Sequence, residues 1–146
     1  MIADRIESLL NNINEKTKSL KMEWRPISEY VDYCNDNEYM SEKIMMLKVN
    51  EFIDFYDDKS FFVRQDSSYL FVLTYQETSA IDGTVTDRCE LYASFYPNSE
   101  VIPVPGYIDG GIKTIRDSIM EYWETENCNY VAEVSGIIGV LKKFTD

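Results

Sequence analysis

The sequence predicts an α+β fold, an antiparallel β-meander of about four strands packed by N-terminal and C-terminal helices. Two observations predict it. Strand-like segments gather between residues 60 and 104, and helical periodicity fills the segments before and after that block. Strands in one block with helices on either side are typical of α+β architecture. No repeat or linker divides the 146 residues, so a single domain over 1–146 is expected.

The first helix is expected over residues 2–20, where apolar side chains recur at helical spacing with polar residues between them. Pro26 ends this region because proline disfavours helix in the residue before it. Ser28 is expected to cap a short helical turn. Residues 35–38 are expected to form a polar loop.

Residues 42–56 are compatible with two structures. The run at 44–47 is typical of a buried strand, whereas a helix capped by Ser41 is favoured because its apolar spacing is sustained over the whole segment. That helix would align on one face the side chains Met45, Val49, Phe52, Ile53 and Tyr56.

Central strands are expected at 60–64, 69–76 and 85–96, with a turn at 65–68. Asp82-Gly83 is expected to form a two-residue hairpin turn, because both central residues of that turn need a positive φ.

Alternation divides the return strand into two faces. Cys89, Leu91, Ala93 and Phe95 are expected on one face, and Glu90, Tyr92, Ser94 and Tyr96 on the other. Residues 101–104 are expected to add an edge strand, since Pro103 cannot donate to a ladder.

Two helices are expected after the strands. The segment 108–123 shows clear helical periodicity and begins after the N-cap Asp109, and 129–143 is expected to form the last helix. The helices at 2–20 and 108–123 are expected to cover the meander.

Composition excludes several kinds of chemistry. The chain has no histidine, which excludes histidine-based triads, histidine general bases and histidine-ligated zinc. Its formal net charge of −12 disfavours nucleic acid and anionic membranes as partners, and it favours a basic protein instead.

The cysteines indicate a reducing compartment. Cys34, Cys89 and Cys128 are odd in number and widely spaced, which argues against a disulfide framework and favours a cytoplasmic location. No segment is apolar enough to span a bilayer, and the first residues lack the pattern of a signal peptide.

Three motifs are weighed against ordinary structural roles. The stretch from Gly106 to Thr114 resembles a phosphate loop, but Ile112 stands where the motif requires lysine. Glu121 and Glu124 could together hold a hard cation, although a solvated acidic face is the default. Cys89 lacks a neighbour that would activate it. No cofactor, metal or catalytic residue is therefore assigned.

Glu90, Tyr92 and Tyr96 form the candidate partner-binding surface. They lie on one predicted strand face, and tyrosines often anchor protein interfaces. The alternative is that helices cover both sheet faces and these rings belong to the core.

The chain also resembles a group of small bacterial proteins. The resemblance is carried by Trp24, by 60–62 and 69–73, and by the segment from Leu91 to Pro97. It implies a helix, a tryptophan, an antiparallel meander and a following helix. The group has no assigned activity, so no functional residue is carried over.

Three functional hypotheses follow. The first is a non-enzymatic acidic module that binds a basic protein, as immunity or antitoxin-like proteins do. The second is a small-ligand binding or sensing domain, with an apolar cavity between the sheet and the helices at 2–20 and 108–123. The third is an enzyme that uses carboxylates and a divalent metal.

Overall fold

A computed structural model describes residues 2–105, 110–121, 123 and 141–145. Its helical elements are α1 (Ile2–Lys18), α2 (Ile27–Glu29), the π-helical turn η1 (Tyr30–Cys34), α3 (Glu38–Val49) and the 3-10 turn η2 (Asp57–Lys59). A further helix occupies 110–121. The strands are β1 (Arg25–Pro26), β2 (Ile53–Phe55), β3 (Phe61–Gln65), β4 (Ser68–Thr78), β5 (Val85–Ser94) and β6 (Ile102–Pro103).

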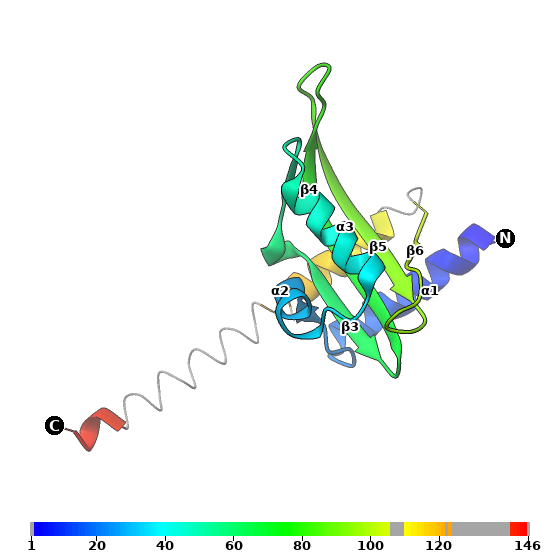
Figure 1. Ribbon diagram of the computed structural model, residues 1–146. Coiled ribbons are helices and arrows are strands. Elements are labelled where there is room, and N and C mark those ends of the chain that lie inside the picture. The colour runs from blue at the N-terminus through cyan, green and yellow to red at the C-terminus, as the bar shows by residue number, and fades with distance from the viewer. Residues whose placement is uncertain (1, 106–109, 122, 124–140, 146) are drawn as a thin grey trace.

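One antiparallel sheet of six strands organises the molecule (Figure 1). Its order is β1-β3-β4-β5-β6, and β2 also pairs with β4. The long strand β4 has room for two partners on one side, because β3 pairs with its first half and β2 with its second half. The α+β fold predicted from the sequence is confirmed, and β1 and β2 are two short strands beyond the expected meander.

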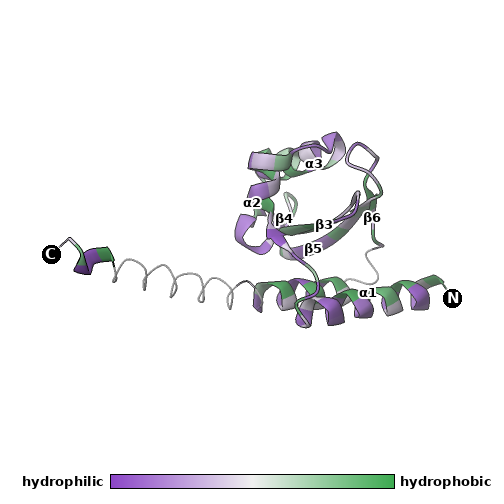
Figure 2. Cartoon of the chain, turned by 90° about the horizontal axis from the view of Figure 1, so that it is seen from below, coloured by the Kyte–Doolittle hydropathy of each residue, from purple (hydrophilic) through white to green (hydrophobic). Residues whose placement is uncertain are grey.

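Helices cover both faces of the sheet (Figure 2). On one face, α1 and the helix at 110–121 pack on a core that includes Phe61, Val72 and Leu91. On the other face, α2, η1 and α3 enclose a second core, which includes the aromatic rings of Tyr30 and Phe71. Alternating residues of each strand therefore enter different cores.

Helix α1 forms as predicted but ends at Lys18, and Leu20 then takes a left-handed φ of 60°. Trp24 fixes the segment that connects α1 to β1. Its indole Nε1–H donates to Thr17 Oγ1 at 3.0 Å, and its backbone oxygen accepts from Trp123 Nε1 at 3.0 Å. The tryptophan thus ties α1 to the opposite end of the sequence.

The segment 42–56 is partly helical, and the prediction for it was wrong in three respects. The helix begins after Asn37, whose side chain accepts from Met40 N, and it ends at Val49. Residues 53–55 form strand β2. The buried face is Met40, Ile44 and Leu47, so Met45 and Val49 point outward. The prediction chose the wrong face because the helix has a second apolar stripe. That stripe includes Met40, which precedes the predicted helix.

The Asp82-Gly83 hairpin was predicted with the wrong turn. Strand pairing stops at Thr78 and Val85, and Ser79 N–H then donates to Thr84 O at 2.8 Å, which leaves a longer loop. Of the two predicted turn residues, Gly83 has a positive φ, of 73°, and Asp82 does not. The Asp82 carboxylate instead accepts from Thr84 N at 3.0 Å. The side chain of Asp82 therefore helps to organise the loop, while the backbone of Asp82 itself stays out of the left-handed region.

Other local predictions also have clear outcomes. The edge position of Pro103 is confirmed in β6, and β5 ends at Ser94, two residues before the predicted end. Ser28 does not cap α2, whose N-cap position is Pro26. The predicted cap Asp109 and the segment 129–140 lie outside the described residues.

Candidate functional site

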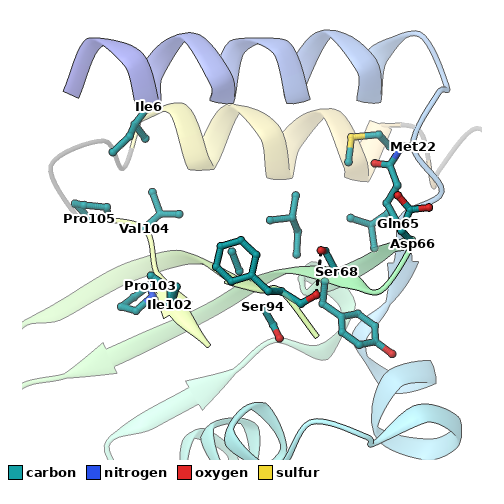
Figure 3. Close-up of a pocket in the computed structure, with 15 residues that line it drawn as sticks. Ile6, Met22, Gln65, Asp66, Ser68, Ser94, Ile102, Pro103, Val104 and Pro105 are labelled. Carbon is teal, nitrogen blue, oxygen red and sulfur yellow. Dashed lines mark hydrogen bonds between the residues drawn. The ribbon is translucent and has the colours of Figure 1, made fainter. Parts of the chain in front are cut away.

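An apolar groove of about 600 Å³ opens between α1 and one end of the sheet. Figure 3 shows its length, from Pro105 and Val104 at one end to Met22, Gln65 and Asp66 at the other. The volume falls within the range of about 300–1,000 Å³ that is typical of small-molecule sites. The groove lies in the region where the ligand-binding hypothesis expects a cavity.

The sheet forms the floor of the groove. Val63, Leu70 and Ala93 come from three adjacent strands, and their side chains share the face that carries α1. Strand alternation explains this arrangement, because Leu91 lies on the same face two residues before Ala93 and is buried in the core. The small side chain of Ala93 leaves open space next to that core.

Exposed apolar side chains form the rim. Phe95 is 65% exposed and Ile102 is 51% exposed, and both line the groove. Ile6 of α1 lies on the opposite side of the opening (Figure 3). Large exposed apolar groups around a hollow are typical of a ligand-binding groove.

Asp66 is the single charged side chain among the described residues that line the groove. It sits in the tight turn between β3 and β4 with a left-handed φ of 58°. The nearby Arg64 belongs to the other face of the sheet, where its guanidinium lies 5.4 Å from the centre of the Tyr69 ring. The groove therefore combines apolar walls with one carboxylate at its end.

A hydrogen-bond network fixes the segment that carries Phe95. Ser68 Oγ donates to Phe95 O at 3.2 Å. The Ser99 hydroxyl accepts from Tyr96 N at 3.1 Å, and Asn37 Nδ2 donates to Ser99 O at 2.9 Å. The rim is thus held by both the sheet and the start of α3.

The three residues of the predicted partner-binding surface differ in exposure. Tyr92 is buried under α3, Glu90 is half-buried, and Tyr96 is exposed beyond the end of β5. The alternative in which helices cover both sheet faces is the one observed. Tyr92 therefore belongs to the core and presents no free surface in this conformation.

Glu90 has a structural role between two tyrosines. Tyr75 Oη donates to Glu90 Oε1 at 2.7 Å. Burial raises the pKa of Tyr75 and of Tyr92, and the Glu90 carboxylate raises the pKa of each phenol further. Both phenols are therefore neutral donors at ordinary pH.

The cysteines of the described chain lack the features of catalytic thiols. Cys89 is buried in the core. The Cys34 residue is exposed as a whole, but its thiol is partly desolvated. This desolvation, and then the Asp36 carboxylate, raise the pKa of the thiol. A raised pKa lowers the thiolate fraction, which is the reactive form.

Two sequence motifs, the carboxylate metal site and the phosphate-loop-like stretch, are compared with the described residues. Among residues with described positions, no group of three or more Cys, Asp or Glu converges on a common point. In the phosphate-loop-like stretch, 106–109 are not described, and Arg116 pairs with Asp117 at 3.0 Å. No helix of the described chain is long and apolar enough to cross a membrane.

Sequence reasoning missed most residues of the groove. Alternation placed Ala93 and Phe95 on the correct face, but it gave no sign that a groove stays open between α1 and these residues. The available signal was the small Ala93 between large apolar neighbours on its own strand face. Comparison with protein-family models, curated proteins and solved structures finds no match, so the chemistry of the groove rests on its own residues.

Proposed function

We propose that this chain is a non-enzymatic binding protein that holds a small, elongated apolar molecule in the groove beneath α1. The groove carries the proposal, because its walls are apolar and Asp66 is the single charge among its described lining residues. Apolar pockets with a few polar groups are the usual form of small-molecule sites.

The charge of the site favours a ligand with a cationic or hydrogen-bond-donating end. Such an end would lie near Asp66, while the apolar chain would contact Leu70, Ala93 and Phe95. A carboxylate ligand would meet both Asp66 and the net charge of −12, which is unfavourable. Alkylammonium compounds are therefore suitable probes.

Ligand length provides a quantitative test. Each buried methylene contributes about 0.8 kcal/mol, so two more carbons should tighten binding about tenfold until the groove is full. We expect octyl-, decyl- and dodecylammonium to displace the neutral dye Nile red with increasing affinity. The corresponding carboxylates should displace it at much higher concentration.

Two matched variants locate the binding. Ala93→Leu should fill the floor of the groove and abolish dye binding, whereas Ala80→Leu in the exposed β4–β5 loop should leave it unchanged. Circular dichroism checks that both variants fold. Equal dye binding by the two variants, or equal displacement by ammonium and carboxylate chains, would contradict the proposal.

A further inference from the structure

Helix α3 is apolar on two opposite sides. Its inner side places Ile44 and Leu47 in the core, yet Met45 is 66% exposed and Val49 is 76% exposed on its outer side. Figure 2 shows α3 as the outermost element on its side of the sheet. Large exposed apolar side chains that share one face are typical of an interaction site, so the outer side has the character of a contact surface.

The outer side has a defined order along the helix. Glu38, Glu42, Met45 and Val49 follow at positions i, i+4, i+7 and i+11, which is the spacing of one helix face. The first two residues are acidic and the last two are apolar. Phe52, which follows three residues after the end of α3, is also 44% exposed.

The acidic half of this face is available for an ionic partner. Within the described chain, Glu38 and Glu42 make no ion pair. The lysines of α3 are directed elsewhere. Lys48 Nζ lies 3.2 Å from Asp57 Oδ1, and Lys43 Nζ lies 5.7 Å from the centre of the Tyr92 ring.

We propose that the outer face of α3 docks a basic amphipathic helix from another protein. Apolar side chains of the partner would pack on Met45, Val49 and Phe52, and its lysines or arginines would meet Glu38 and Glu42. Methionine surfaces adapt well to helical ligands. The net charge of −12 would accelerate encounter with such a basic partner.

Charge argues against a second copy of this chain as the occupant. In an antiparallel pair of α3 helices, Glu38 and Glu42 would lie against Met45 and Val49, which would desolvate the carboxylates without a partner. In a parallel pair, the carboxylates would face each other and repel. A basic helix avoids both costs.

The test uses a fluorescently labelled synthetic helix with leucines along one half of a face and lysines along the other half. A second peptide has glutamate in place of each lysine, and a third has the lysine peptide's composition in scrambled order. We expect the lysine peptide to bind, measured by fluorescence anisotropy, and the other two to bind at least about tenfold more weakly.

Variants of the chain assign the binding to α3. Met45→Asp with Val49→Asp should weaken the lysine peptide at least about tenfold. Glu38→Lys with Glu42→Lys should reverse the preference toward the glutamate peptide. The control Leu9→Asp changes an exposed apolar residue of α1, on the other side of the sheet, and should alter affinity less than about twofold.

Three results of the peptide measurements would overturn the proposal. They are failure of the lysine peptide to bind the wild-type chain, unchanged affinity in the folded α3 variants, and equal binding of the scrambled peptide. Sedimentation that shows a wild-type dimer dissociated by Met45→Asp would also overturn it, because a second copy would then occupy the face. The Ala93→Leu groove variant should bind the lysine peptide normally, which separates this site from the groove.

Discussion

Asn37 joins more of the structure than any other polar side chain discussed above. It is fully buried. Its Oδ1 accepts from Met40 N at 3.0 Å, and its Nδ2 donates to Ser99 O at 2.9 Å and Ser94 Oγ at 3.2 Å. Its backbone N–H donates to Tyr30 Oη at 2.8 Å. The residue therefore caps α3 and fixes the segment after β5 at the same time.

Replacement of Asn37 by alanine should be strongly destabilising. The substitution removes a helix cap and leaves Ser99 O without its buried donor, so we expect the free energy of unfolding to fall by about 3 kcal/mol. Urea denaturation followed by tryptophan fluorescence measures the change. Asn98→Ala, at an exposed site nearby, should change it by less than about 0.5 kcal/mol. Similar losses in the two variants would contradict this role.

Tyr69 makes stability depend on alkaline pH. Burial first, and then the hydrogen bond that its hydroxyl donates to Asp36 Oδ2 at 2.9 Å, raise its pKa to about 12. The folded chain therefore holds this proton more tightly than the unfolded chain, in which tyrosine titrates near about 10. The stabilisation is complete below pH 10 and is lost as pH rises toward 12.

Tyr69→Phe should remove the contribution of Tyr69 to this dependence while keeping the ring. The difference in unfolding free energy between wild type and Tyr69→Phe should shrink between pH 10 and 12, by up to about 1.4 kcal/mol per pH unit. Denaturation at a series of pH values, with absorbance at 295 nm to follow phenol ionisation, measures it. A difference that stays constant over this range would show that Tyr69 is not responsible.

At the scale of elements, α3 shows how sequence periodicity can mislead. The helix carries two apolar stripes, and the one that suited the window 42–56 is the outer stripe. The inner stripe begins with Met40, which lies in the first turn of the helix. Periodicity identifies a helix but cannot choose between two apolar faces, because that choice depends on what the sheet presents beneath it.

Two glycines should respond in opposite ways to substitution by alanine. At Gly83 and at Gly110 an added Cβ meets nothing within 4 Å, so a clash with neighbouring atoms does not contribute to the effect of either substitution on stability. Gly83 has a φ of 73°, and alanine there should cost about 1 kcal/mol. Gly110 lies in a helix, and alanine there should gain about 0.5 kcal/mol. Thermal denaturation of both variants tests the two signs, and equal signs would contradict the account.

At the scale of the whole molecule, the sheet divides the interior into two cores that differ in composition and in packing. The core beneath α3 is rich in packed aromatic rings, with Tyr30 and Phe71 centroids 5.0 Å apart. The core beneath α1 opens into the groove at one end. We infer that the first core provides rigidity and the second provides the binding site.

The sequence predicts the fold much better than the site. The α+β order, the strand alternation around Leu91 and the edge position of Pro103 all follow from local rules, and each is confirmed. The groove depends instead on how closely α1 packs on the sheet around Ala93, which is a matter of tertiary packing. Glu90, Tyr92 and Tyr96 appeared as one surface because alternation places residues on a face without showing what covers that face.

The central claim, that the groove holds an apolar ligand, can be tested at one methyl group. The chain has alanine at four positions, 3, 80, 93 and 132. In protein labelled with carbon-13 at the alanine methyls, titration with dodecylammonium should shift the NMR signal of Ala93 and leave that of Ala80 in place. A saturating shift of Ala93 alone is the predicted result. An unchanged Ala93 signal under conditions in which the ligand binds elsewhere would contradict the account.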